Sequence, residues 1–271
     1  MTVVRHPLPT APTGPRRLPR PPGRSCHCVA LDLGGARTRA WSEGRGTLID
    51  VPTVTPSGAG VPRGALTDVP GTARLLERLL GHRMPRLARP LVVVTTPVLD
   101  GPAHRERARA AVGVLHPRAV LTVPTARAVA LAVDADLSRP LLVVDLGAHL
   151  TEVVLLADGM VFDARRTPLG TADLSGAATP VDLREAVTAM LTSMLRQDRT
   201  PLTADALSRG GLLAGGGALR PDLTYRLTGV LEAPLRPVPA PHTAAVRGAA
   251  LLLRSAHRHP STGRNQERPA P

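Results

Sequence analysis

The chain has 271 residues, enough to bury a sizeable core in one large domain or two small ones. Its formal net charge is +13 and all 34 basic residues are Arg, a skew that, with abundant Ala, Gly and Pro, indicates GC-rich coding more than selection for a basic binding surface. With one Trp, one Tyr and one Phe, the chain lacks the stacking surfaces of single-strand binders, so no dedicated nucleic-acid function is expected.

Two tails rich in Pro and Arg, residues 1–24 and 256–271, are expected to be disordered. The first tail carries prolines from Pro7 onward and lacks the apolar region of a signal peptide. No run reaches the ~18 apolar residues of a membrane span. Cys26 and Cys28 are too close for an unstrained disulfide, and no second cluster completes a zinc site, so we expect reduced thiols in a cytoplasmic protein.

Between the tails, strands and helices alternate. Short apolar runs flanked by Gly or Pro predict buried strands at Val29–Leu31, Leu91–Thr95, Val120–Val123, Leu141–Val144, Glu152–Leu156 and Leu212–Ala214. Apolar residues three or four apart predict helices around Leu75–Leu80, Ala108–Leu115, Leu183–Met194 and Val246–Leu253. Pro85 is expected to end the first of these helices, and Thr243 is expected to cap the start of the last. The alternation predicts an α/β fold with a mixed or parallel sheet in each half.

One motif occurs twice. Cys28–Gly35 and Leu142–His149 are each an apolar strand that ends in Asp-Leu-Gly and runs into a tight turn. The repeat predicts two related halves that face one ligand. Such a turn presents a carboxylate, here Asp32 or Asp145, and free backbone N–H groups, which suit a phosphate and its metal.

A third glycine-rich turn, Gly215–Gly217, follows the strand at Leu212–Ala214 and runs into an expected helix start at Ala218-Leu219. Together the three turns predict a site for nucleotide phosphates. A chain without Lys has no Gly-x-x-x-x-Gly-Lys motif, which excludes a P-loop protein.

The order of these motifs resembles the actin-like ATPase superfamily, and within it the bacterial MreB/Mbl group of rod-shape-determining proteins. The resemblance covers about residues 28–254. Val29–Arg37 looks like the first phosphate loop, Val143–Glu152 like the second, and Val92–Pro97 like the stretch that links them. Gly211–Leu219 looks like the adenosine loop, and Pro239–Ala250 looks like the closing helix.

The resemblance implies two RNase H-like subdomains around a nucleotide cleft, residues 25–135 closed by a C-terminal helix at 243–255, and residues 136–242. It implies ATP with Mg²⁺, self-association or assembly with other actin-like filament proteins, and work with the cell-wall elongation machinery at the inner membrane face. By the same resemblance Asp32 and Asp145 hold Mg²⁺ through water. The nucleotide is expected against Gly34, Gly35, Gly147, Ala148, His149, Gly215, Gly216 and Gly217.

The chain departs from the family pattern in three places. In the second phosphate loop the Gly-Gly-Thr expected after Gly147 reads Ala148, His149, Leu150, and two readings of His149 stay open: its imidazole contacts phosphate, or its bulk blocks close backbone approach. The family's Glu-Glu-Pro motif, aligned on Pro124, has Thr122 and Val123 where the acids belong, so the carboxylate that positions the attacking water is replaced. The segments between Arg45 and Leu91 and between Gly170 and Val181 are too short for the family's small outer subdomains, which we expect to be reduced or absent. The missing acid and the missing subdomains argue against efficient hydrolysis. We expect an MreB-like protein that still binds ATP weakly and assists cell shape or wall synthesis; whether it turns over ATP, as an actin-type ATPase does, stays open.

Three alternatives also stay open. One is a degenerate actin-like scaffold that works without nucleotide. Another is an Arg-tailed protein in peripheral contact with an anionic membrane or with nucleic acid. A third is a remote relative, such as a fragment of an acetate or sugar kinase.

Overall fold

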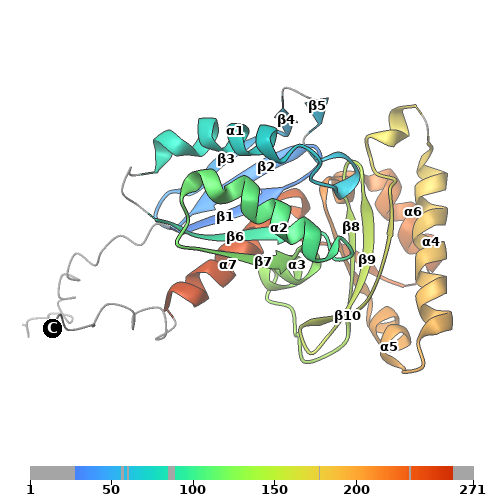
Figure 1. Ribbon diagram of the computed structural model, residues 1–271. Coiled ribbons are helices and arrows are strands. Elements are labelled where there is room, and N and C mark those ends of the chain that lie inside the picture. The colour runs from blue at the N-terminus through green and yellow to red at the C-terminus, as the bar shows by residue number, and fades with distance from the viewer. Residues whose placement is uncertain are drawn as a thin grey trace, which may run out of the picture.

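The computed structural model describes residues 28–55, 58–59, 61–84, 89–176, 178–231 and 233–258, and these form two lobes, each built on a five-stranded sheet (Figure 1). Both predicted tails lie outside these ranges except for residues 256–258, which continue the last helix. Cys26 also lies outside them, while Cys28 is buried in the first strand. Within the described ranges, no helix has the length and apolar character to cross a membrane.

The two sheets have the same topology. The first contains β1 (Cys28–Leu33), β2 (Arg37–Ser42), β3 (Gly46–Pro52), β6 (Leu91–Thr96) and β7 (Ala119–Pro124), in the order β3-β2-β1-β6-β7. The second contains β8 (Leu141–Leu146), β9 (Thr151–Ala157), β10 (Met160–Thr167), β11 (Gly211–Ala214) and β12 (Leu235–Pro237), in the order β10-β9-β8-β11-β12. In each sheet the first three strands are antiparallel and the last two run parallel to the first, which confirms the duplicated α/β halves.

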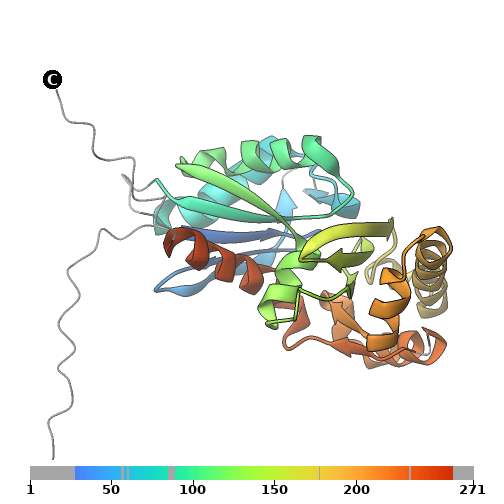
Figure 2. The ribbon, with the colours of Figure 1, turned by 90° about the horizontal axis from the view of Figure 1, so that it is seen from below.

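Helices cover both faces of each sheet. They are α1 (Val69–Leu80), α2 (Gly101–Val112), α3 (Thr125–Ala132), α4 (Pro180–Gln197), α5 (Leu202–Arg209), α6 (Pro221–Leu231) and α7 (Ala244–Arg258). In the first lobe α1 and α2 pack on one face and α7 on the other (Figures 1 and 2). In the second lobe α4, α5 and α6 pack on the outer face and α3 on the inner one. Because both faces are buried, β6 and β8 are continuous apolar runs rather than alternating ones.

Local sequence sets where the main helices begin. Asp68 precedes α1 and its side chain accepts a hydrogen bond from the N–H of Gly71. Thr179 and Asp182 form a reciprocal capping box at the start of α4, and Pro180 occupies its first turn. Each cap satisfies N–H groups that have no partner inside the helix.

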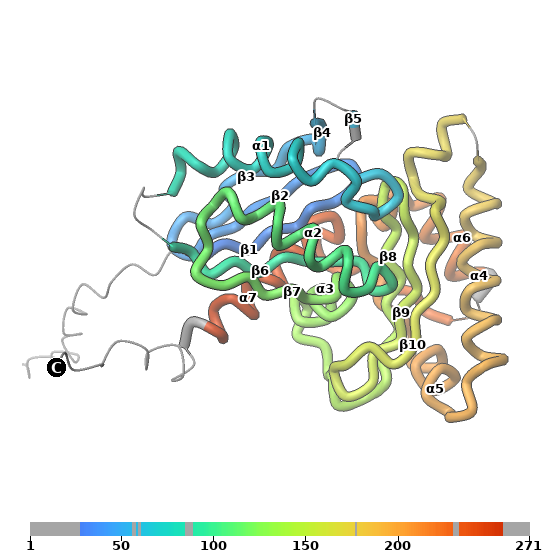
Figure 3. Tube along the Cα trace, viewed as in Figure 1, coloured from blue at the N-terminus to red at the C-terminus, as the bar shows by residue number. Residues whose placement is uncertain are grey.

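The lobes are joined by the pair α3 and α7. After α3 the chain builds the second lobe and then returns to the first as α7, which packs against β1 and β6 (Figure 3). Ala128 of α3 belongs to the core of the first lobe, whereas Val129 belongs to that of the second. Gly248 of α7 meets α3 so closely that a Cβ there would lie 1.7 Å from the carbonyl oxygen of Ala128.

The outer subdomains are small, as the segment lengths predict. Between β3 and α1 the described residues form the two-stranded β4 (Val54–Thr55) and β5 (Gly58–Ala59) and the 3₁₀ turn η1 (Pro62–Gly64). Between β10 and α4 they form one 3₁₀ turn, η4 (Asp173–Ser175). Little structure therefore stands over either side of the space between the lobes.

Several elements differ from the sequence prediction. The pattern missed β2, β3, β4, β5, β10, β12, α3 and α5. The helix start predicted at Ala218-Leu219 is wrong, because Gly216–Leu219 form the 3₁₀ turn η5 and α6 begins at Pro221, a residue suited to a first helical turn. The helix at Leu75–Leu80 runs into the 3₁₀ turn η2 (Gly81–Arg83), and Pro85 lies outside the described residues. Likewise, α2 ends in the 3₁₀ turn η3 (Gly113–Leu115).

The contact between α3 and α7 makes a stability prediction. Gly248→Ala should destabilise the protein by at least about 2 kcal/mol, because the added methyl group forces the two helices apart. Gly229→Ala is the matched control: Gly229 is also helical but exposed, with nothing within 4 Å of a Cβ, so this change should be neutral or stabilise by up to about 1 kcal/mol. Urea unfolding of both variants measures the difference, and equal stabilities would contradict the close contact.

Candidate functional site

A cavity of about 280 Å³ lies between the two lobes. Its walls come from the β1–β2 turn, the β8–β9 turn, the turn after β11, and the 3₁₀ turn η6 (Pro241–Thr243). The predicted site residues that line it are Asp32, Gly34, Gly35, Asp145, Gly147, Ala148, His149, Gly215 and Gly216. Gly217 instead packs below its turn, where a Cβ would lie 2.6 Å from that of Leu146.

The two Asp-Leu-Gly turns have the same geometry. The N–H of Gly34 donates to the carbonyl of Arg37 at 3.1 Å, and the N–H of Gly147 donates to that of Leu150 at 2.9 Å. A Cβ at either glycine would lie within 3 Å of the same carbonyl oxygen, at 2.9 Å and 2.6 Å respectively. Glycine is therefore required at both positions by close backbone approach.

A threonine supports each turn from outside. Thr53 donates its hydroxyl to the carbonyl of Gly34 at 2.8 Å. Thr171 donates its N–H to the carbonyl of Gly147 at 3.0 Å. The duplication thus extends beyond the motif to the residues that hold each turn in place.

The third turn packs directly against Asp145. Gly215 has a φ of +82°, and a Cβ there would lie 2.4 Å from Oδ1 of Asp145, so no other residue fits without rearrangement. Its N–H donates to the carbonyl of Pro241 at 3.1 Å, which ties the turn to η6. Gly216, the next residue, has open space where a Cβ would be.

Each aspartate faces a charged residue on the neighbouring antiparallel strand, and the sequence analysis missed both partners. Asp32 of β1 lies in register with Arg39 of β2, and Asp145 of β8 lies in register with Glu152 of β9. Directly opposite residues share one face of a sheet, and all four line the cavity. The sequence contains a signal that could have revealed both partners. Arg39 and Glu152 follow their aspartates at the same spacing, each after a buried threonine.

Burial raises the pKa of the three cavity carboxyls. The pKa of Asp145 rises to about 7, through desolvation and the nearby charge of Asp32. The pKa of Glu152 also rises to about 7, through desolvation and the charge of Asp145. Desolvation raises the pKa of Asp32 as well, opposed by a 2.7 Å hydrogen bond from Thr95 and by the charge of Arg39.

The donor set does not fit a Mg²⁺ ion coordinated directly by protein side chains, and the expected contact of Asp32 and Asp145 with Mg²⁺ through water stays a prediction. Asp32, one of the two expected ligands, already has the guanidinium of Arg39 at 3.7 Å and accepts the hydrogen bond of Thr95. No group of three His, Cys, Asp or Glu side chains in the described ranges is arranged to hold a metal. A hard cation of this kind prefers several free oxygen ligands.

Thr122 and Val123, at the positions of the family's acids, are not among the residues that line the cavity. Thr122 pairs with Val94 in the sheet, and Val123 is buried in the core between the first sheet and α7. Neither supplies a carboxylate that can orient water.

Side chains bridge the two lobes around the cavity. Arg63 of η1 hydrogen-bonds the carbonyl of Pro168 and lies 3.4 Å from Asp173, both in the second lobe. Oε1 of Glu152 accepts the N–H of Val98 at 3.0 Å, which joins β9 to the segment after β6. The lobes are therefore held in a closed arrangement.

No protein-family model matches the chain, and no curated protein sequence does. Solved structures do match. The chain superposes on MreB5 of Spiroplasma citri bound to AMPPNP with a TM-score of 0.76 and 14% identity, over 89% of this chain and 99% of that one. The match to the same protein bound to ADP has a TM-score of 0.74 and 14% identity, over 86% and 97%.

Two further matches are less similar. The ethanolamine utilization protein EutJ from Carboxydothermus hydrogenoformans gives a TM-score of 0.62 and 17% identity, over 87% of this chain and 91% of that one. A chain of the PilM–PilN type IV pilus biogenesis complex gives 0.62 and 16%, over 83% and 98%. The chain therefore has the actin-like two-lobed fold, and the predicted resemblance to MreB is confirmed as a likeness of fold.

The raised pKa of Glu152 predicts how stability depends on pH. The folded state keeps the Glu152 proton up to about pH 7 while the unfolded chain loses it near its ordinary pKa of 4.5, so this group's contribution to stability is complete below about pH 4.5 and is lost as pH rises through 7. Glu152→Gln still accepts the Val98 N–H, and should be about 1–3 kcal/mol more stable than the parent near pH 8 and equal to it near pH 4.5.

Urea unfolding across this pH range provides the measurement. Glu185→Gln, at an exposed carboxylate on α4, is the matched control and should leave the pH dependence unchanged. A parallel pH dependence in the parent and Glu152→Gln would show that folding does not raise the pKa of Glu152.

Proposed function

We propose that the chain is an actin-like nucleotide-binding protein that uses the cavity between its lobes to hold the phosphates of an adenine nucleotide. The observation that carries this proposal is the convergence of three glycine turns on one cavity, two of them with the same hydrogen bonds. Glycine turns of this kind direct backbone N–H groups toward an anion. The binding of ADP and AMPPNP by MreB5 supports the choice of nucleotide.

The size of the cavity bears on how a nucleotide is held. Its volume of about 280 Å³ lies just below the ~300–1,000 Å³ of typical ligand pockets. The bridge from Arg63 to Pro168 and Asp173 closes the lobes over it. Phosphates fit the closed cavity, and a whole nucleotide requires the bridge to open.

We further propose that the protein retains its nucleotide rather than turning it over rapidly. Thr122 and Val123, at the positions of the family's acids, carry no carboxylate that can orient the attacking water. On this proposal the nucleotide controls the shape of the protein and its assembly. We propose that its cellular role is that of an MreB-like cytoskeletal protein that assists cell shape or wall synthesis. The higher TM-score to MreB5 than to EutJ or the PilM–PilN chain supports this role.

A second candidate function is a scaffold that binds partners without nucleotide. The lobes are bridged by Arg63 and by Glu152 with no ligand required, which favours a fixed shape. The similarity to a chain of a two-protein complex, PilM–PilN, also supports partner binding.

Gly216 provides a test that separates the two candidates. It lines the cavity, and a side chain there meets open space, so both Gly216→Glu and Gly216→Gln should fold. We expect Gly216→Glu to weaken ADP binding at least about tenfold, because its carboxylate repels the phosphates, and Gly216→Gln to stay within about threefold of the parent.

Isothermal titration calorimetry with ADP measures both variants against the parent. Equal affinity of the Glu and Gln variants would place the phosphates elsewhere. If the parent binds no ADP at millimolar concentration, the nucleotide proposal fails and the scaffold remains.

A further inference from the structure

Arg39 is a nearly buried arginine whose donors are not saturated. Its side chain is 12% exposed, lines the cavity, and forms ion pairs of 3.7 Å with Asp32 and 3.3 Å with Asp50. Its Nε is buried, and its 3.3 Å contact with Oδ1 of Asp50 does not have hydrogen-bond geometry. Arg37, two residues earlier, hydrogen-bonds Oδ1 of Asp50 at 2.5 Å and the Asp50 carbonyl at 2.6 Å, so the two arginines share Asp50.

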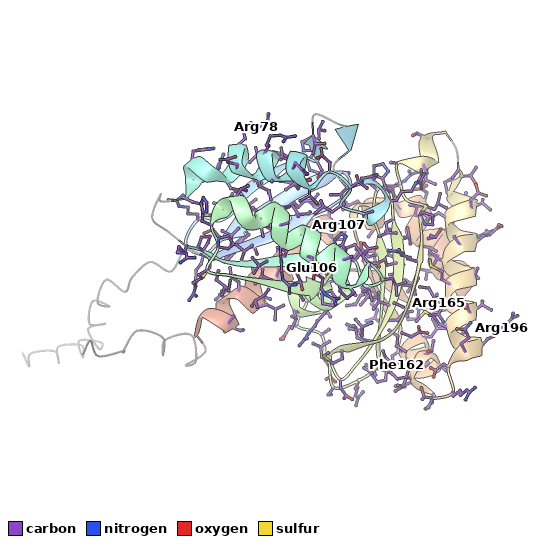
Figure 4. All side chains as sticks on the ribbon, viewed as in Figure 1. Arg78, Glu106, Arg107, Phe162, Arg165 and Arg196 are labelled. Carbon is purple, nitrogen blue, oxygen red and sulfur yellow. The ribbon has the colours of Figure 1, made fainter. Side chains whose placement is uncertain are left out.

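Arginines on the outer helices are placed differently. Arg78, Arg107 and Arg196 project from the outer faces of α1, α2 and α4 (Figure 4). Arg39 instead stands within the cleft, where burial makes an incompletely paired guanidinium costly unless an anion approaches it. Arginine is also permanently charged and matches phosphate oxygens with paired N–H donors.

Comparison of the two duplicated lobes shows that only the first has an arginine at this strand position. At the position equivalent to Arg39 the second lobe has Glu152. Arg37 also lines the cavity but is 42% exposed, so Arg39 supplies the nearly buried positive charge beside the three carboxyls. The positive charge lies against Asp32, which the family resemblance assigns to Mg²⁺. A divalent cation at Asp32 would therefore be repelled by Arg39 at short range.

We infer that Arg39 takes the place of the divalent cation: it binds a phosphate of the nucleotide directly, and binding does not require Mg²⁺. This inference rests on the proposed nucleotide function. Asp32 then serves to hold the guanidinium at the cavity wall instead of coordinating metal. The N–H groups of Gly34, Gly147 and Gly215 donate within the fold, so the other backbone N–H groups of these turns supply the remaining donors to the phosphates.

Calorimetry with ADP in excess EDTA and in millimolar MgCl₂ tests the inference. The parent should bind with affinities that agree within about threefold in the two buffers. Arg39→Met keeps the aliphatic stem of the side chain. Its affinity for ADP should fall at least about tenfold in EDTA and less in MgCl₂, because loss of the guanidinium leaves Asp32 free to bind the cation. In EDTA, the affinity of Arg39→Lys for ADP should lie between that of the parent and that of Arg39→Met.

Arg45→Met is the matched control, because Arg45 lies in the β2–β3 turn and donates to the carbonyl of Arg83, away from the cavity. It should bind as the parent does, and an equal loss in this variant would overturn the assignment to Arg39. Thermal melts confirm that each variant folds; the comparison of buffers for the parent needs no variant at all. Binding by the parent in MgCl₂ but not in EDTA overturns the inference alone, whereas binding in neither buffer overturns the proposed function with it.

Discussion

The arrangement of the whole molecule depends on the close approach of α3 and α7. Each helix contributes to the core of both lobes, and at Gly248 their backbones meet without room for a methyl group. This contact brings the chain's last helix back beneath the first sheet and fixes where the ends of β1 and β8 lie. The two Asp-Leu-Gly turns face one cavity because the helix pair holds the sheets that carry them.

The cleft is symmetric in backbone and asymmetric in charge. The turns, their supporting threonines and the strand order repeat between the lobes, so the two turns have the same backbone geometry. The side chains at the next equivalent position, Arg39 and Glu152, have opposite charges. The first lobe therefore neutralises its aspartate with a guanidinium, while the second holds two carboxyls whose pKa values burial raises to about 7.

The sequence predicted the elements whose signal is local and strong. Continuous apolar strands, such as those ending at Asp32 and Asp145, and the regular stripe of α4 were recognised because burial on both faces or one face leaves a clear pattern. Strands β2 and β10 were missed because they carry several arginines and alternate only weakly. Helix α3 was missed because its Ala-rich segment shows little periodicity and depends on tertiary packing. For α6 only a helix start was predicted, at Ala218-Leu219, shortly before the helix begins at Pro221.

The site residues were likewise predicted only where their signal is local in the sequence. The glycines and aspartates were found because a repeated motif is visible in one dimension, and all but Gly217 line the cavity. Arg39 and Glu152 were overlooked because their importance comes from strand register, which places each opposite an aspartate. The bridge from Arg63 to Asp173 joins residues far apart in the chain, and only the folded arrangement of the lobes reveals it.

The central claim is that one ligand contacts all three glycine turns at once. Hydrogen–deuterium exchange of the full chain, with and without saturating ADP, tests it most directly. The account predicts slower exchange together at the β1–β2 turn, the β8–β9 turn and the turn at Gly215–Gly217, with α1 and α4 unchanged. Protection at a single turn, or none at any of them, would contradict it.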